Sequence, residues 1–186
     1  MTRRQGSWNR VIGGRKAKNR GTAFENLFRA QFQNKGIFVL RFPDGCERRG
    51  MTAYGRPRLV AVKTPFDWIL SIPGRSAYID TKTTGGNTFV YSAIVQHQIE
   101  ALHQLEFHGH IAGYVVHFQN TQRVVFFWAS HLARLNSGEG LRPEQGFDLG
   151  TLYQMEPMRL FGIYPTIRGV RQQVRLLGDS PDEGEE

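Results

Sequence analysis

The sequence predicts a single α/β domain, because segments with helical periodicity alternate with segments typical of strands along most of its 186 residues. Helices are expected at about 22–35 and 92–107. Apolar runs that indicate strands occur at 37–42, 66–72, 77–83, 111–118 and 123–128, and the strand at 37–42 is expected to be buried. We place the domain at 21–176, between a basic arm at 1–20 and an acidic tail at 177–186, and expect both ends to be disordered.

The charge balance favours a polyanionic partner. Lys and Arg total 24 against 16 Asp and Glu, which gives a net charge of +8, so nucleic acid is the first expectation and an anionic membrane surface the second. A basic insert at about 46–63 is expected to form a projecting loop or a short ribbon. The side chains that we expect to contact DNA phosphates are Arg15, Lys16, Lys18 and Arg20 in the arm and Arg48, Arg49, Arg56 and Arg58 in the insert. The alternative for the arm is an ordinary solubilising segment.

Other classes of function lack their signatures. Cys46 is the single cysteine and has no internal partner for a disulfide, which favours a reducing cytoplasm. No run of about 18 apolar residues predicts a membrane span. The glycine-rich loops of nucleotide-binding proteins and the spacing of zinc ligands are also missing, so no organic cofactor is expected.

The stretch from Phe66 to Thr83 is predicted to be a β-hairpin, because Pro73 and Gly74 separate two apolar runs. If Ile72 pairs with Arg75, the numbers of opposite residues sum to 147, so Asp67 faces Asp80. Opposite side chains have Cβ atoms roughly 5 Å apart, where two like charges are destabilising. A divalent cation together with Lys82, which shares a face with Asp80, would supply the missing positive charge. The alternative is an exposed hairpin edge with solvated charges.

Two further polar residues have competing interpretations. Glu25 stands three residues after Thr22, as in a capping box, and local sequence favours that structural role over one at a metal site. Gln98 falls on or beside the apolar stripe of the second helix, so its amide needs polar partners. Those partners are either the backbone or a cluster of carboxylates, metal and water.

The order of these features resembles a known nuclease family. Pro65-Phe66-Asp67 followed by Asp80-Thr81-Lys82 resembles the core motif of the PD-(D/E)xK nucleases, and the whole order is similar to the RecU-type Holliday junction resolvases. The matching pieces are Arg20-Gly21-Thr22-Ala23-Phe24-Glu25, Phe66-Asp67, Tyr78-Ile79-Asp80-Thr81-Lys82, Gln96-His97-Gln98-Ile99-Glu100 and Gly109-His110-Ile111-Ala112. The resemblance covers roughly 20–130 and implies a restriction-endonuclease-like core, with a central mixed β-sheet flanked by helices.

The resemblance also implies an activity, namely paired nicking of four-way DNA junctions by a C2 homodimer that requires Mg²⁺ or Mn²⁺. Its site residues map onto Glu25, Asp67, Asp80, Lys82 and Gln98, with the three carboxylates as the metal ligands. The family commonly has Glu where this chain has Asp80, whose side chain is one methylene shorter. The alternatives are a DNA nuclease of the same fold without junction preference, and a non-catalytic DNA-binding protein on the same scaffold.

Overall fold

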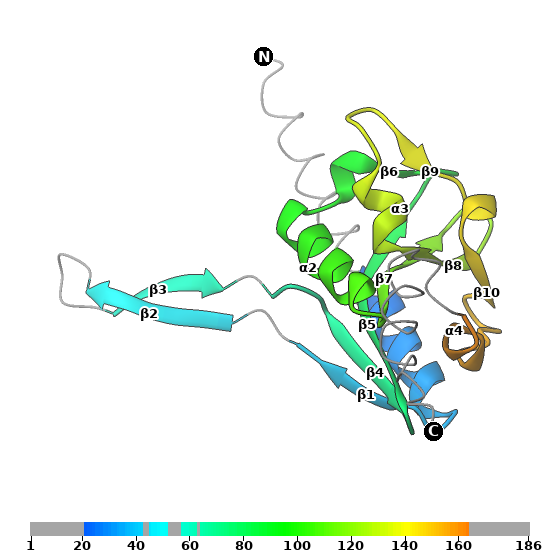
Figure 1. Ribbon diagram of the computed structural model, residues 1–186, viewed down its shortest axis with the longest axis horizontal. Helices are drawn as coiled ribbons and strands as arrows, with labels where there is room; N and C mark the ends of the chain where they lie inside the picture. The colour runs from blue at the N-terminus through cyan, green and yellow to red at the C-terminus, as the bar shows by residue number, and fades with distance from the viewer. Residues whose placement is uncertain (1–20, 43–44, 52–56, 63, 164–186) are drawn as a thin grey trace, which may run out of the picture.

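A six-stranded sheet runs through the body of the protein in the computed structural model (Figure 1). The structure describes residues 21–42, 45–51, 57–62 and 64–163. For 45–51 and 57–62 it describes the backbone alone. The order across the sheet is β1-β4-β5-β7-β8-β10. The strands are β1 (Phe38–Arg41), β4 (Trp68–Ile72), β5 (Arg75–Thr84), β7 (Ile111–Phe118), β8 (Arg123–Trp128) and β10 (Phe147–Thr151). The strands β5 and β7 are parallel and the other neighbours are antiparallel. The predicted central mixed sheet with flanking helices is confirmed.

One face of the sheet is covered by the first helix, described over 21–33, and by the short helix α4 (Met158–Phe161). Phe24, Phe28 and Phe32 recur every four residues, so they form one apolar stripe along the helix. All three are buried, and the ring of Phe28 lies 5.6 Å from that of Trp68 in β4. This stripe holds the first helix, and with it Glu25, against the sheet.

The opposite face is covered by α2 (Gln96–Phe107), α3 (Ala129–Ala133) and a small sheet of β6 (Phe89–Val90) with β9 (Gly140–Leu141). Ile99 and Leu102 of α2 are buried against β7. The single-turn helices η1 (Tyr91–Ala93) and η2 (Pro143–Gln145) complete this part of the chain. The second helix was expected to begin near Ser92, but Val95 is extended and α2 begins only at Gln96.

The central strand β7 is buried at all eight positions because helices cover both faces of the sheet.

The strand β1 lies at the edge of the sheet and is more exposed than β7. The apolar run at 37–42 was expected to be a buried strand, yet Phe38 is 62% exposed and Leu40 is 43% exposed. Composition alone does not distinguish a central strand from an edge strand, and the prediction of burial was wrong for these two residues.

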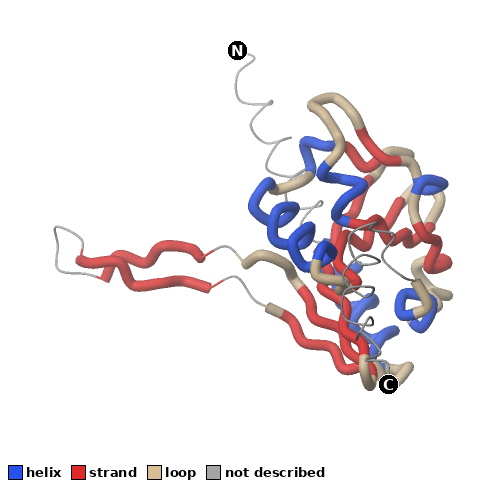
Figure 2. Tube along the Cα trace, viewed as in Figure 1, coloured by secondary structure: helices blue, strands red, loops and turns tan. Residues whose placement is uncertain are grey.

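A two-stranded antiparallel ribbon, β2 (Gly45–Met51) and β3 (Pro57–Val62), extends away from the body between β1 and β4 (Figures 1 and 2). The predicted basic insert therefore has the ribbon form. The predicted arm at 1–20 and tail at 177–186 lie outside the described residues. No helix in the described part of the chain is long and apolar enough to cross a membrane.

Candidate active site

The hairpin of β4 and β5 has the register that the sequence predicts. Ile72 pairs with Arg75, and the ladder continues to Trp68 opposite Ile79. Asp67 comes one residue before β4, and its backbone N–H donates to the Ile79 carbonyl at 3.1 Å. The ladder ends at this pair, and Asp67 and Asp80 come next on the two chains, near enough for the charge of Asp67 to raise the pKa of Asp80.

Asp67 is held in place from both sides. Its backbone carbonyl accepts a hydrogen bond from the Phe42 N–H at 2.7 Å. Its Oδ2 accepts from the Thr81 N–H at 3.2 Å and from the Thr81 hydroxyl at 3.4 Å. The indole Nε1 of Trp68 donates to that hydroxyl at 3.2 Å. Sequence reasoning missed Thr81 and Trp68, because they occupy unspecified positions beside the motif residues.

Asp80 is completely buried, with 0% of the residue exposed. The ammonium of Lys82 forms an ion pair with its Oδ1. Apart from Lys82, neither oxygen of the carboxylate has a hydrogen-bond partner among the described residues. Burial raises the pKa of Asp80 to about 7, against the attraction of Lys82 and with a further upward contribution from Asp67.

Glu25 projects from the first helix toward the same region. Its Oε2 forms an ion pair with Arg41 at 2.7 Å. Burial raises the pKa of Glu25, Arg41 lowers it, and Asp67 and Lys82 lie near enough to contribute as well. The capping-box prediction is wrong, because Thr22 is already helical and therefore does not stand at the N-cap.

Gln98 lies in the first turn of α2, the helix that packs across β7 and β5. The residue is buried, and its Oε1 has no hydrogen-bond partner in the described part of the chain. The prediction that Gln98 faces inward is correct. The alternative interpretation, in which a backbone group donates a hydrogen bond to the side-chain oxygen of Gln98, is not observed.

The structure thus brings Asp67, Asp80 and Lys82 together on the hairpin, with Glu25 near them and Gln98 on the helix that covers this face. The predicted phosphate contacts are less well described. Arg15, Lys16, Lys18, Arg20 and Arg56 lie outside the described residues, and Arg48, Arg49 and Arg58 lie in the ribbon, where only the backbone is described.

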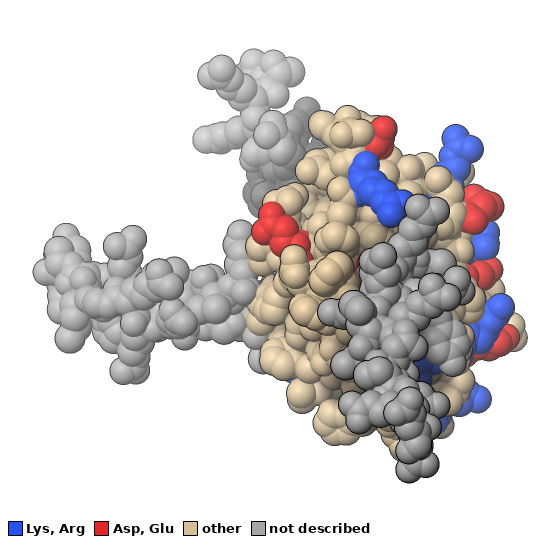
Figure 3. Space-filling view, viewed as in Figure 1, with Lys and Arg blue, Asp and Glu red and all other residues tan. Residues whose placement is uncertain are grey.

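The surface of the body carries charges of both signs. Arg123 pairs with Glu144 at 3.0 Å and with Asp148 at 2.9 Å, and Arg159 lies 3.6 Å from Glu156. In Figure 3, blue and red side chains accordingly alternate along one edge of the body. Paired charges of this kind give no basic patch on that edge.

The donor set at the hairpin fits a hard divalent cation. Mg²⁺ is usually bound by one or two carboxylates and keeps several waters, and Asp67 and Asp80 offer two carboxylates near each other. The oxygens of Asp80 are buried with Lys82 as their sole described partner, as expected of a cation ligand. Within the described ranges, no group of three or more His, Cys, Asp and Glu residues is suitably placed for a metal ion, so the three predicted carboxylate ligands Asp67, Asp80 and Glu25 do not form one such group.

Comparison with known proteins places these residues in a family context. Residues 59–145 match the model of the RecU family, described as recombination protein U. Among solved structures, the chain is similar to Hjc of Archaeoglobus fulgidus, described as a Holliday junction resolvase from an archaeal hyperthermophile. The identity is 16% over 69% of this chain and 95% of that chain, with a TM-score of 0.46. No curated protein sequence matches the chain.

The RecU match begins in β3 and ends in η2, so it includes the strands and helix that carry Asp67, Asp80, Lys82 and Gln98. It does not reach the first helix, and the place of Glu25 rests on geometry alone. The match agrees with the resemblance to the RecU-type resolvases that the sequence motifs indicated, and it covers 87 of the 186 residues.

Proposed function

We propose that this protein is a metal-dependent endonuclease that resolves four-way DNA junctions by paired nicks, in recombination and repair in the cytoplasm. The observation that carries the proposal is the state of Asp80. A carboxylate with 0% exposure and Lys82 as its sole described partner is unfavourable in a protein that binds no cation. It is expected where a cation and a scissile phosphate are bound.

Each site residue then has a chemical role. Asp67 and Asp80 hold Mg²⁺ or Mn²⁺, and Glu25 contributes directly or through water. The bound ion supplies Lewis-acid charge at the phosphoryl oxygen and at the leaving oxygen. Lys82 orients the attacking water and offsets the charge that develops on the phosphate. Gln98 holds the attacking water or the phosphate with its amide.

The distribution of charge supports binding of DNA by the arm and the ribbon. In the ranges 21–42 and 64–163, nine Lys and Arg residues balance nine Asp and Glu residues. Residues 1–20 add seven basic residues and no acidic one, and 43–63 adds five basic and two acidic residues. The excess positive charge therefore belongs to the arm and to the ribbon segment, and we expect affinity for DNA to fall steeply with salt.

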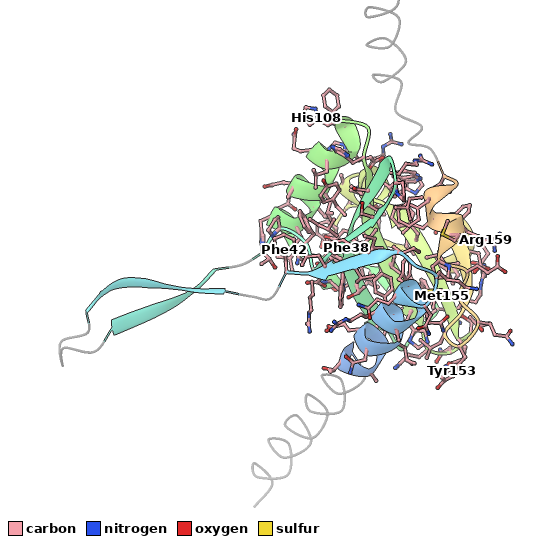
Figure 4. The ribbon with its side chains drawn as sticks, turned by 90° about the horizontal axis from the view of Figure 1, so that it is seen from below. Phe38, Phe42, His108, Tyr153, Met155 and Arg159 are labelled. Carbon is pink, nitrogen blue, oxygen red and sulfur yellow. The ribbon has the colours of Figure 1, made fainter. Side chains whose placement is uncertain are left out.

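Two cuts in one junction require two active sites, and we propose a homodimer. Phe38 and Leu40 support an interface on the exposed edge strand β1, because they are exposed on the same face of that strand. Figure 4 shows Phe38 on β1 and Phe42 where the chain leaves this strand for the ribbon. Sedimentation should give a dimer for the wild type and a monomer for a Phe38→Glu variant. A monomeric wild type would refute this part of the proposal.

The test of function is cleavage of a labelled mobile four-way junction in Mg²⁺ and in Mn²⁺, with linear duplex as competitor and Asp80→Asn as the inactive variant. Symmetric nicks in opposing strands that need metal and disappear in the variant are expected. The matched control is Glu156→Gln, which removes an exposed carboxylate outside the site and should cleave like the wild type.

Two other results would refute the proposal in different ways. Equal cutting of linear duplex and junction would make the protein a nuclease without junction preference. Tight junction binding with no cleavage in either metal would make it a DNA-binding protein on a nuclease scaffold.

A further inference from the structure

Tyr114 lies in β7 beside the proposed metal site. It is the Cα partner of Asp80 across the parallel pair of β5 and β7. Partner residues on neighbouring strands point to the same face of a sheet, so the side chain of Tyr114 stands next to that of Asp80 on the face that α2 covers. The residue has 0% exposure, and none of the sequence motifs that indicate the site includes it.

The hydroxyl of Tyr114 is buried without a hydrogen-bond partner among the described residues. A buried hydroxyl without a partner is unfavourable. The ring packs 6.0 Å from that of Phe89 in an apolar cluster, where a phenylalanine would make the same contacts without that cost. We therefore expect the hydrogen-bond partner of this hydroxyl to be a molecule bound at the site.

Other unpartnered buried oxygens on this side of the sheet belong to the proposed site. They are the Asp80 carboxylate oxygens, apart from the ion pair with Lys82, and Gln98 Oε1 on α2. These atoms accept hydrogen bonds, whereas a tyrosine hydroxyl also donates one. Thr83 Oγ1 and His117 Nε2 are also buried without a partner, but their alternation along β5 and β7 places them on the opposite face.

The position and the chemistry of this hydroxyl make it a donor beside the site. The ammonium of Lys82 lies 6.0 Å from the centre of the Tyr114 ring, so the ring borders the Asp80–Lys82 pair. A tyrosine phenol has an ordinary pKa of about 10, so it carries its proton at neutral pH and can donate a hydrogen bond.

We propose that Tyr114 is a positioning residue, whose hydroxyl donates a hydrogen bond to a water bound by the oxygens of Asp80 and Gln98. This water links β5, β7 and α2 and fixes the Asp80 carboxylate in the orientation that receives the cation. The inference rests on the proposed function, because it assigns Tyr114 to the metal site of that nuclease. Loss of a hydrogen bond that orients a metal ligand typically lowers metal affinity about 10- to 100-fold.

The test compares Tyr114→Phe with the wild type, and Tyr78→Phe is the matched control. Tyr78 is also a tyrosine on this face, two residues before Asp80, but its ring packs with Phe66 and His110 instead. Three quantities are measured, namely thermal unfolding in EDTA, Mn²⁺ binding from the EPR signal of the free ion, and junction cleavage as a function of Mg²⁺ concentration.

We expect Tyr114→Phe to unfold at the wild-type temperature or above it, because the hydroxyl has no protein partner to lose. Its Mn²⁺ affinity should fall about 10-fold, and its cleavage should need more Mg²⁺ but approach the wild-type rate at saturation. Tyr78→Phe should match the wild type in metal binding and in cleavage.

Unchanged Mn²⁺ affinity in Tyr114→Phe, with a wild type that binds metal and resolves junctions, would overturn this inference and leave the proposed function standing. A lower unfolding temperature in EDTA would also overturn it, since the hydroxyl would then stabilise the fold itself. A wild type that neither binds Mn²⁺ nor cleaves would overturn both.

Discussion

Replacing Asp80 by Asn should abolish cleavage and at the same time stabilise the metal-free protein. The pKa of Asp80 rises from its ordinary 3.8 to about 7 in the fold, chiefly because of burial. Each pKa unit corresponds to about 1.4 kcal/mol, so ionised Asp80 reduces the free energy of unfolding by about 4 kcal/mol above pH 7. Asn has a similar shape and no charge, and it removes this cost. Lys82 loses its partner in the variant, but its side chain is 25% exposed and reaches water.

The sign of the pH dependence follows from proton binding. Between about pH 4 and 7 the folded protein holds a proton on Asp80 that the unfolded chain has released, so wild-type stability falls as pH rises through this range. The variant lacks this dependence. The stability difference between variant and wild type should therefore be small near pH 4 and grow by up to about 1.4 kcal/mol per pH unit until pH 7.

Urea unfolding in EDTA, followed by tryptophan fluorescence at several pH values, measures this difference. Mg²⁺ should then stabilise the wild type, by about 2.7 kcal/mol at a hundred times its dissociation constant, and leave the variant unchanged. The control Glu156→Gln should stay within about 0.5 kcal/mol of the wild type at every pH. An Asp80→Asn protein that is less stable than the wild type at pH 8, or a difference that does not vary with pH, would refute the reasoning.

Three further outcomes are expected. Lys82→Ala should reduce single-turnover cleavage at least 100-fold while the junction affinity in gel shifts stays near that of the wild type; a parallel loss of affinity would contradict its catalytic role. Thr81→Val removes one donor to Asp67 and should lower Mn²⁺ affinity about 10-fold; unchanged metal binding would show that the backbone N–H alone suffices. Joint replacement of Arg48 and Arg49 by Ala should reduce the salt slope of junction binding by about 2, whereas an unchanged slope would remove these side chains from the DNA interface.

The sequence predicted the hairpin most completely, because the Pro73–Gly74 turn and the alternation of side chains determine its register locally. From that register it also predicted that Asp67 and Asp80 are neighbours, and the ladder in the structure confirms the register. The inward position of Gln98 followed from helical periodicity in the same way. These features depend on residues that are close together in the sequence.

The features that the sequence did not predict depend on segments far apart in the chain. The ion pair between Glu25 and Arg41 replaces the expected capping box, and it forms only because the first helix packs beside β1. The exposure of Phe38 depends on β1 being at the edge of the sheet. The place of Tyr114 beside Asp80 depends on the parallel pairing of β5 with β7, which the helix α2 separates in the chain.

The hydrogen bond between the Phe42 N–H and the Asp67 carbonyl connects the ribbon to the proposed metal site. Phe42 precedes the ribbon and Asp67 follows it, so this bond closes the base of the ribbon on the residue that is proposed to hold the cation. A displacement of the ribbon would therefore act on Asp67, a proposed metal ligand, through this backbone hydrogen bond. Coupling between two sites is reciprocal. Any factor by which junction binding at the ribbon changed the affinity for Mg²⁺ would therefore equal the factor by which Mg²⁺ changed the affinity for the junction.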